Sequence, residues 1–310
     1  MLVNDKKNEE FITQLAENVT EKIENNAIVG RSLWQDANRR FFRNKAAVTS
    51  LILLCLIVLF IIFVPMLMPF SYEDTDWNMM GVAPDFESGH YLGTDSSGRD
   101  LLVRIAIGGR ISLMVGILGA IISVLIGTIY GAISGYVGGR TDSIMMRLIE
   151  ILSSFPFMFF IILLVTFFGQ NILLIFIAIG AIAWLSLARI VRGQTLSLKN
   201  KEFIEAAKVT GVSNTKIVSK HIIPNVLGIV AVYASLEVPN LILFESFLSF
   251  LGLGTQEPMS SWGALLSDGA AQMETSPWLL IFPALFLCLT LFCFNFIGDG
   301  LRDALDPKDK

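Results

Sequence analysis

Charged residues are scarce in this chain. Asp, Glu, Lys and Arg make up 16% of its 310 residues, and 54% of the residues are hydrophobic. Soluble proteins carry about a quarter charged residues, so an ordinary soluble domain is excluded and lipid is the natural surrounding of most of the chain. The formal net charge of −4 says little about partners, because in membrane proteins the placement of Lys and Arg matters more than their sum.

Side chains that carry metal or nucleophilic chemistry are also few. Cys55, Cys288 and Cys293 lie inside long apolar runs without Cys-x-x-Cys spacing, which predicts packing residues. His90 lies in a polar loop and His221 beside a basic segment, so no catalytic dyad is suggested. No Gly-Lys pair occurs, and the chain therefore lacks the phosphate loop that holds ATP in many ATPases. We expect no metal and no cofactor in this chain.

Long apolar runs, by contrast, are abundant. A bilayer core is crossed by roughly 20 residues, and in lipid the backbone must satisfy its own hydrogen bonds, so such runs are expected to be helices. The sequence therefore predicts an all-α integral membrane protein with six transmembrane helices. The expected spans are residues 46–70, 111–137, 149–168, 172–188, 222–244 and 278–297.

Basic residues are distributed unevenly between the connections. Residues 1–45 lack the apolar core of a cleavable signal peptide and are expected to be a cytosolic tail, with residues 46–310 as one transmembrane domain. Twenty of the 23 Lys and Arg residues lie in this tail, in the C-terminus and after the second and fourth spans. By the positive-inside rule, both termini are expected to be cytosolic.

A patterned polar segment, KEFIEAAKVTGVSNTKIVSKHIIPN, follows the fourth span at residues 201–225. Residues 202–210 are good helix formers, and Gly211 supplies a stop that tolerates positive φ. Ser213 can then cap a second helix that enters the membrane near Pro224. Two interpretations follow from physics alone: a module that docks in a groove of a partner, or a helix that lies on the membrane.

This segment resembles the EAA signature of permease subunits in bacterial ATP-binding-cassette (ABC) importers. The resemblance implies that residues 201–219 form a coupling loop, which seats in a cleft of a separate ATPase subunit. The residues at matching offsets, and hence the implied ATPase-coupling residues, are Glu205, Ala206, Ala207, Gly211, Ile217 and Pro224.

Further stretches narrow the resemblance to the C-type permeases of oligopeptide and dipeptide importers, from about residue 40 to the end. They are LGTDSSGRD at 92–100, ARIVRGQTLSLK at 188–199, HIIPN at 221–225, and ESFLSFLGLG at 245–254 with Ser261-Trp262-Gly263. The resemblance implies the MetI-like fold of type I ABC importer permeases, in a bacterial plasma membrane. The implied cargo is an oligopeptide, with dipeptides or nickel chelates as alternatives.

The same resemblance implies a set of partners. They are a B-type permease in a heterodimer, two ATP-binding subunits that hold ATP and Mg, an extracellular peptide-binding protein and the peptide itself. The chain also contacts the lipid bilayer, and we expect no nucleic acid. Catalysis on the transported molecule is not expected, because ATP hydrolysis belongs to the partner subunits.

Two carboxylates lie within or at the edge of the fifth span. Acidic groups at membrane depth are costly and usually face a cavity or a partner. Glu237 is expected to line the pathway. Glu245 belongs to the family-like stretch, which indicates an outer gate or a subunit contact, with a site at the membrane–water interface as the alternative.

The polar turn before the second span also has two interpretations. Asp95 or Ser96 can cap the following helix. The resemblance instead implies that Asp95, Arg99 and Asp100, together with Trp262, contact the binding protein or close the outer end of the path.

Glycine and proline patterns predict how the helices pack. Gly127, Gly131 and Gly135 form a small-xxx-small pattern, which predicts a close helix contact either within this subunit or with the partner permease. Pro156 and Pro283 predict helix bends, which are either static or part of a gate.

The sequence disfavours two other classes of membrane protein. An ion-coupled secondary transporter needs paired ionisable residues within the spans, and apart from Glu237 the spans offer almost none. An intramembrane enzyme needs a catalytic set within the spans, such as Ser-Lys or paired Asp, and none is visible.

Overall fold

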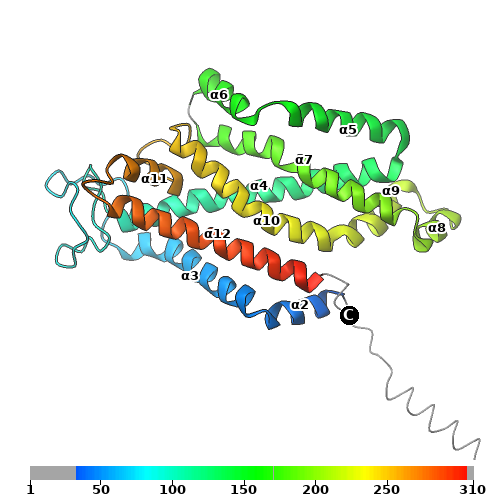
Figure 1. Cartoon of the computed structure of the whole chain (residues 1–310), viewed down its shortest axis with the longest axis horizontal. Helices are drawn as coiled ribbons and strands as arrows, with labels where there is room; N and C mark the ends of the chain where they lie inside the picture. The colour runs from blue at the N-terminus through cyan, green and yellow to red at the C-terminus, as the bar shows by residue number, and fades with distance from the viewer. Residues whose placement is uncertain (1–32, 170, 306–310) are drawn as a thin grey trace, which may run out of the picture.

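The computed structural model describes residues 33–169 and 171–305 as a bundle of helices, most of which run along one common axis (Figure 1). These residues contain no β-strand, only an isolated bridge between Thr94 and Asp100. The all-α fold class is confirmed. The helices are α2 (Leu33–Arg43), α3 (Lys45–Leu67), α4 (Leu101–Val137), α5 (Gly139–Ser154), α6 (Phe157–Phe168), α7 (Ile172–Leu198), α8 (Glu202–Val209), α9 (Asn214–Ile217), α10 (Ile223–Phe250), α11 (Trp262–Ala271) and α12 (Trp278–Leu305).

The described residues contain five helices long and apolar enough to cross a membrane, or up to six spans if the bent pair of α5 and α6 counts as one. The five are α3, α4, most of α7 (Phe176–Leu198), α10 with the turns before it (Asn214–Phe250), and α12. The third expected span, residues 149–168, is instead divided between α5 and α6, which are bent by 71°. Phe155 and Pro156 both have extended backbones at the break, because proline has no N–H and disfavours helical geometry in the residue before it.

Several helices are longer than the apolar runs that predicted them. α4 already begins at Leu101, where the Asp100 carboxylate accepts a hydrogen bond from the Val103 N–H at 2.9 Å. α7 continues to Leu198 and α12 to Leu305, past the predicted ends at residues 188 and 297. Run length marks only the part of a helix that faces lipid, so the polar continuations were missed.

α4 lies at the centre of the bundle, between α7 and α10. The glycine pattern of α4 faces α7: a Cβ on Gly131 would stand 2.4 Å from the Ala188 carbonyl oxygen, and one on Gly135 would stand 2.7 Å from the Thr195 Cβ. Of the two contacts that this pattern left open, the one inside the subunit is therefore present.

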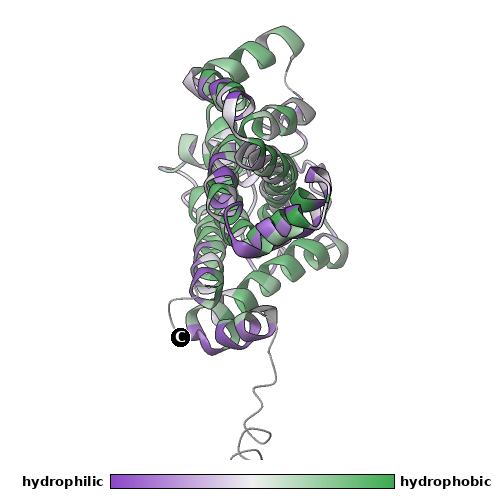
Figure 2. Cartoon of the chain, turned by 90° about the vertical axis from the view of Figure 1, so that its right-hand side faces the viewer, coloured by the Kyte–Doolittle hydropathy of each residue, from purple (hydrophilic) through white to green (hydrophobic). Residues whose placement is uncertain are grey.

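The two ends of the bundle differ. At one end, which we call the α8 end, lie α8, α9, α2 and the last turns of α12 (Figure 1). At the opposite end, the α11 end, lie α11 and the loop at residues 71–100 (Figure 1). Figure 2 looks onto the α8 end: the long helices are mostly hydrophobic, and hydrophilic residues gather on the short segments nearest the viewer. The predicted tail at residues 1–45 lies mostly outside the described residues, except for α2 and the start of α3.

Candidate functional site

The segment with the EAA-like pattern forms α8 at the α8 end of the bundle. Glu202 and Glu205 lie in the first turn of α8 and Lys208 in its last turn. Acidic groups near a helix N-terminus and basic groups near its C-terminus are favourable, because they complement the helix dipole. The helix predicted over residues 202–210 is confirmed by α8, and Thr210 is its C-terminal cap residue.

Gly211 ends α8 in the way that the sequence predicted. Its φ of 77° lies in the left-handed region, which a residue without a Cβ adopts at little cost. The Gly211 N–H donates to the Lys208 carbonyl and the Val212 N–H donates to the Ala207 carbonyl, both at 3.0 Å. This hydrogen-bond pair is a Schellman motif, and it turns the chain sharply towards α9.

One face of α8 and the end of α9 are packed onto the membrane-spanning helices. Ile204 and Ala207 of α8 are 0% and 8% exposed, and Ile217 of α9 is 0% exposed. They join a hydrophobic cluster to which α4, α7 and α10 contribute. The other buried members are Ala132, Leu187, Val191, Ile222, Val226 and Val230.

The opposite face of α8 points away from the bundle. Glu205 and Ala206 are exposed, Phe203 is 42% exposed and Val209 is 88% exposed. Phe203, Ala206 and Val209 are spaced three residues apart, so they lie along one side of the helix. An apolar stripe on a short surface helix is the kind of surface that docks in a partner's groove.

Polar contacts connect the segment to α4. The Tyr136 hydroxyl donates to the Asn214 carboxamide oxygen at 2.9 Å, and the Lys208 ammonium lies 5.7 Å from the centre of the Tyr136 ring. The Lys199 ammonium donates to the Gly135 carbonyl at 3.0 Å. The last turn of α4 is therefore in contact with Lys208 of α8, Asn214 of α9 and Lys199 at the end of α7.

A π-helical turn at Val218–Ile222 joins α9 to α10. In it the Ile223 N–H donates to the Val218 carbonyl. Pro224 follows in the first turn of α10, where the missing N–H of proline is tolerated. Ser213 occupies the cap position of α9, but its hydroxyl makes no capping hydrogen bond.

The α11 end contains a buried ionic network. Arg99 donates through Nε to the Asp95 carboxylate at 2.8 Å and through Nη2 to the Glu257 carboxylate at 2.6 Å. Arg104 at the start of α4 also contacts Asp95, and its Nη2 lies 3.9 Å from both Glu257 and Asp268. The network thus joins the loop at residues 71–100, α4 and α11.

The carboxyl groups at the edge of this network have shifted pKa values. The hydrogen bond from Arg99 lowers the pKa of Glu257, and burial raises the pKa of Asp268. Glu257 is therefore held in its charged form, while the surroundings of Asp268 favour the neutral form.

Asp100, and neither Asp95 nor Ser96, caps α4. Its carboxylate also lies 2.8 Å from the His90 imidazole Nδ1, so the loop is fastened to the helix start. Asp95 instead accepts hydrogen bonds from the Ser97 and Arg99 N–H groups at 2.8 and 2.9 Å. The cap prediction was wrong because several acidic and hydroxyl residues compete for one position within a short turn.

Glu245 lies inside a cluster of hydroxyl groups near the same end. Ser112 and Ser249 donate to its two carboxylate oxygens at 2.8 and 2.7 Å. The Trp262 N–H donates to the Ser112 hydroxyl at 3.2 Å, and the Trp262 indole donates to the Ile105 carbonyl at 3.0 Å. Glu245 thus fixes α11 against α4 and α10. Glu237, which comes earlier in α10, is half-buried.

The sequence-predicted outer residues are interior in this chain. Asp95, Arg99 and Asp100 are 4%, 5% and 1% exposed, and Trp262 is 0% exposed. Because these residues are buried, they are better placed to hold the outer loop and α11 in position than to contact a partner directly. Glu257 and Asp268, whose side chains are 65% and 48% exposed, are members of the network that a partner can reach.

Sequence reasoning missed Arg104, Glu257, Asp268 and Ser112. A signal existed for Arg104: a cation at the start of an apolar span requires a partner. No local pattern connects it to Glu257, which lies far along the chain. In the described residues, no group of His, Cys, Asp and Glu side chains is placed to hold a metal ion.

Long apolar helices packed around α4, with the short helix α8 at one end, define a multi-pass membrane protein. Comparison with known families agrees. The chain belongs to the family described as the inner membrane component of binding-protein-dependent transport systems, whose model matches residues 124–309. A second model, described as the N-terminal TM domain of oligopeptide transport permease C, matches residues 32–84.

Curated relatives are similar over nearly the whole chain. The oligopeptide transport system permease protein OppC of Haemophilus influenzae is 78% identical over 306 residues, which are 99% of this chain and 97% of that protein. OppC of Escherichia coli K12 is 74% identical, over 98% of this chain and 99% of that protein. The dipeptide transport system permease protein DppC of Bacillus subtilis is 44% identical, over 89% and 86%. The resemblance to C-type permeases is confirmed.

Proposed function

We propose that this chain forms half of the transmembrane path of an ABC importer for oligopeptides. The relatives at 78% and 74% identity are named oligopeptide permeases, whereas the dipeptide permease is 44% identical. The other half of the path is a B-type permease. Two ATPase subunits bind at the α8 end, and a peptide-binding protein delivers cargo at the α11 end. Residues 46–310 act as one transmembrane domain behind a cytosolic tail.

The coupling element is α8. One face of this helix contacts the ATPase subunit, and the other contacts the membrane-spanning helices. The outward stripe of Phe203, Ala206 and Val209, with Glu205 beside it, seats in a cleft of the ATPase subunit. The movement of the ATPase subunits is transmitted to the spans by the buried residues Ile204 and Ala207 of α8 and Ile217 of α9. The observation that carries this proposal is the 88% exposure of the apolar Val209 side chain next to the buried, membrane-connected face.

The proposal predicts that Val209→Asp uncouples transport without unfolding the chain. Val209 makes few contacts within the chain, so the aspartate should leave the melting temperature of the purified transporter unchanged. It should lower peptide-stimulated ATP turnover and ATP-driven uptake in proteoliposomes by tenfold or more, which corresponds to roughly 1.4 kcal/mol of lost interface energy.

Thr141→Asp, at an exposed position of α5, is the matched control that adds the same charge. It should behave as the unsubstituted chain. Normal uptake by the Val209→Asp transporter would reject α8 as the coupling element.

A further inference from the structure

Glu237 is a carboxylate in the membrane-spanning part of α10. It lies 14 residues after Ile223 and 13 before Phe250, and so near the middle of the helix. None of the salt bridges among the described residues includes it. A carboxylate at membrane depth is costly unless water or a cationic group compensates its charge. The compensation for Glu237 therefore comes from water, a second chain or a ligand.

Glu237 belongs to a polar stripe on α10. Tyr233, Glu237 and Asn240 are spaced four and three residues apart, so they lie along one side of the helix. Tyr233 is 41% exposed, Asn240 is exposed and Glu237 is half-buried. The Asn240 side chain is hydrogen-bonded to the Glu237 carboxylate, and its amide also donates to the Leu236 carbonyl at 3.1 Å. The carboxylate is thus held in place on a side of α10 that this chain leaves partly open.

Other sides of α10 are covered by neighbouring helices. A Cβ on Gly116 of α4 would stand 2.6 Å from the Ile242 Cγ1. One on Gly298 of α12 would stand 2.6 Å from the Leu236 Cδ2. Figure 1 shows α10 between α7 and α12. The buried sides of α10 are therefore apolar contacts within the subunit, whereas the polar stripe is available to something outside it.

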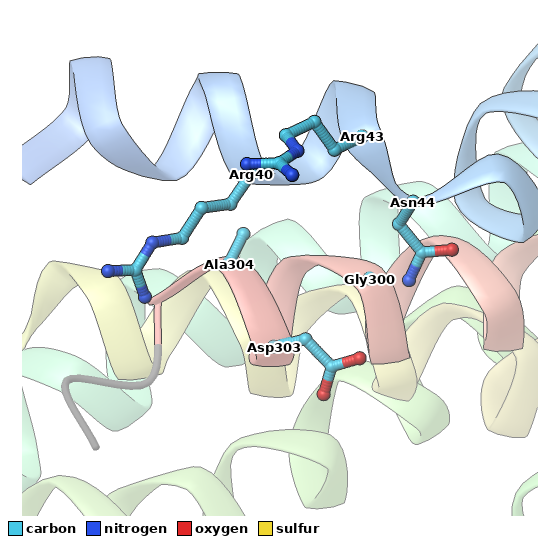
Figure 3. A pocket seen from close by; sticks show the side chains of 6 residues that line it. All are labelled: Arg40, Arg43, Asn44, Gly300, Asp303 and Ala304. Atoms are coloured by element: carbon cyan, nitrogen blue, oxygen red, sulfur yellow. The ribbon is translucent and has the colours of Figure 1, made fainter. Parts of the chain in front are cut away.

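The open cleft of about 320 Å³ near the α8 end is a different feature. It lies between α2 and the last turns of α12 (Figure 3). Its lining residues are Arg40, Arg43, Asn44, Gly300, Asp303 and Ala304, and none of them belongs to α10. The stripe is thus an open helix face and not a wall of this cleft.

The chemistry of the stripe indicates what it meets. Lipid is a poor surrounding for Glu237 and Asn240, because neither side chain can satisfy its polar groups there. Peptides of different sequence share two features, an ammonium group at the N-terminus and the amide groups of the backbone. A carboxylate forms its strongest hydrogen bonds with such a cation, and a carboxamide offers both a donor and an acceptor to an amide.

We propose that the stripe of Tyr233, Glu237 and Asn240 lines the path for cargo, and that Glu237 binds the N-terminal ammonium of the passing peptide. This inference rests on the proposed function, in which the path runs between this chain and a second permease. The ammonium loses water as it enters the middle of the membrane, and the carboxylate offsets that loss. Because the ammonium is common to peptides of any sequence, the contact does not restrict the side chains of the cargo.

The first test measures the uptake of three peptides, Ala-Ala-Ala, Ala-Lys-Ala and Ala-Glu-Ala, by the complete transporter with its binding protein in proteoliposomes. Glu237→Gln should lower the number of peptides imported per ATP hydrolysed by tenfold or more, the usual contribution of a hydrogen bond to a charged group. The loss should be similar for all three peptides, because they share the N-terminal ammonium. The ratio to the unsubstituted transporter cancels any preference of the binding protein.

Two variants serve as controls. Glu237→Asp keeps the charge and should retain most of the uptake. Asp299→Asn removes one negative charge at an exposed position of α12 and should import normally. Normal uptake with Glu237→Gln, a loss confined to Ala-Lys-Ala, or an equal loss with Glu237→Asp would each overturn the inference. A parallel fall in ATP turnover and uptake would indicate a structural role and would also overturn it. Absence of ATP-driven uptake by the unsubstituted transporter would instead reject the proposed function.

The second test asks whether the stripe meets water in the assembled transporter. Asn240→Cys should react with a small, charged methanethiosulfonate reagent and add one label to the baseline of the unsubstituted chain, which has three free cysteines. An unreactive Asn240→Cys would mean that lipid or protein covers this side of α10, and it would overturn the assignment of the stripe to the path.

Discussion

Neighbouring residues of α8 differ in burial in a way that the sequence pattern does not predict. The EAA-like pattern identifies Glu205, Ala206 and Ala207, but it cannot say which alanine faces the bundle. In the structure Ala207 is 8% exposed and Ala206 is exposed. Residues next to each other on a helix point about 100° apart, so the packing of Ile204 decides the direction of both. A charge at Ala207 therefore tests folding, and a charge at Val209 tests coupling.

The pair of Arg99 and Glu257 gives the stability of the α11 end a pH dependence. The pKa of Glu257 is lowered from 4.5, so its stabilisation is present above about pH 4.5 and is lost as the pH falls through the lowered pKa. We expect Glu257→Gln to melt at a lower temperature than the unsubstituted chain at pH 7, and at the same temperature once the pH is well below 4. Because the Glu257 side chain is 65% exposed, solvent screening keeps the difference small.

Melting curves of both proteins from pH 7 to pH 3 provide the measurement. The pKa of Asp268 is raised by burial and, to a smaller extent, by the charge of Glu257, so the comparison is made with Asp268→Asn in both proteins. A melting difference that stays constant down to pH 3 would contradict the assignment.

Whole helices were predicted better than their ends. Long apolar runs located every span, since nothing but a helix satisfies its backbone in lipid. The run lengths could not show that α4 begins at Leu101, that α10 continues to Phe250, or that α11 folds within the loop after it. Those boundaries depend on caps and on distant partners such as Ser112 and Trp262. The break at Pro156 was indicated as a bend, but its angle depends on the packing around it.

The contact of α4 with α7 gives a prediction for the helices as units. Gly131→Ala places a methyl group 2.4 Å from the Ala188 carbonyl oxygen, so the helices must separate. We expect a loss of about 1–3 kcal/mol, typical of overpacking. The matched control is Gly193→Ala on α7, where a Cβ meets nothing within 4 Å. The control should be neutral or stabilising, because alanine favours a helix over glycine.

Thermal unfolding of the purified transporter in detergent compares the two glycine variants. Equal melting temperatures for them would show that α4 and α7 are not held at the distance seen in the structure.

The chain as a whole has two ends that should lie on opposite sides of the membrane. Positive charges cluster at the α8 end, which predicts that this end is cytosolic. Thr141→Cys, at an exposed position in the first turn of α5, should react with a membrane-impermeant maleimide only after the cells are opened. Phe86→Cys, at a position 82% exposed in the loop at the α11 end, should react in spheroplasts that are still sealed. Labelling of Thr141→Cys from outside would reverse the orientation.

Labelling must be read against the native cysteines. Cys55, Cys288 and Cys293 lie within the spans α3 and α12, so they should stay unreactive towards a polar reagent. The unsubstituted chain supplies that baseline.

α10 runs from the π turn beside the coupling segment to Phe250, past the Glu245 cluster. Its 28 residues make a rod of about 42 Å at the usual rise per residue. A tilt of only 10° about one end would carry the other end through about 7 Å, a displacement on the order of a helix radius with its side chains. On the proposed function, a small rotation at the start of α10 would therefore be amplified at its other end into a movement wide enough to open or close a passage for a peptide chain.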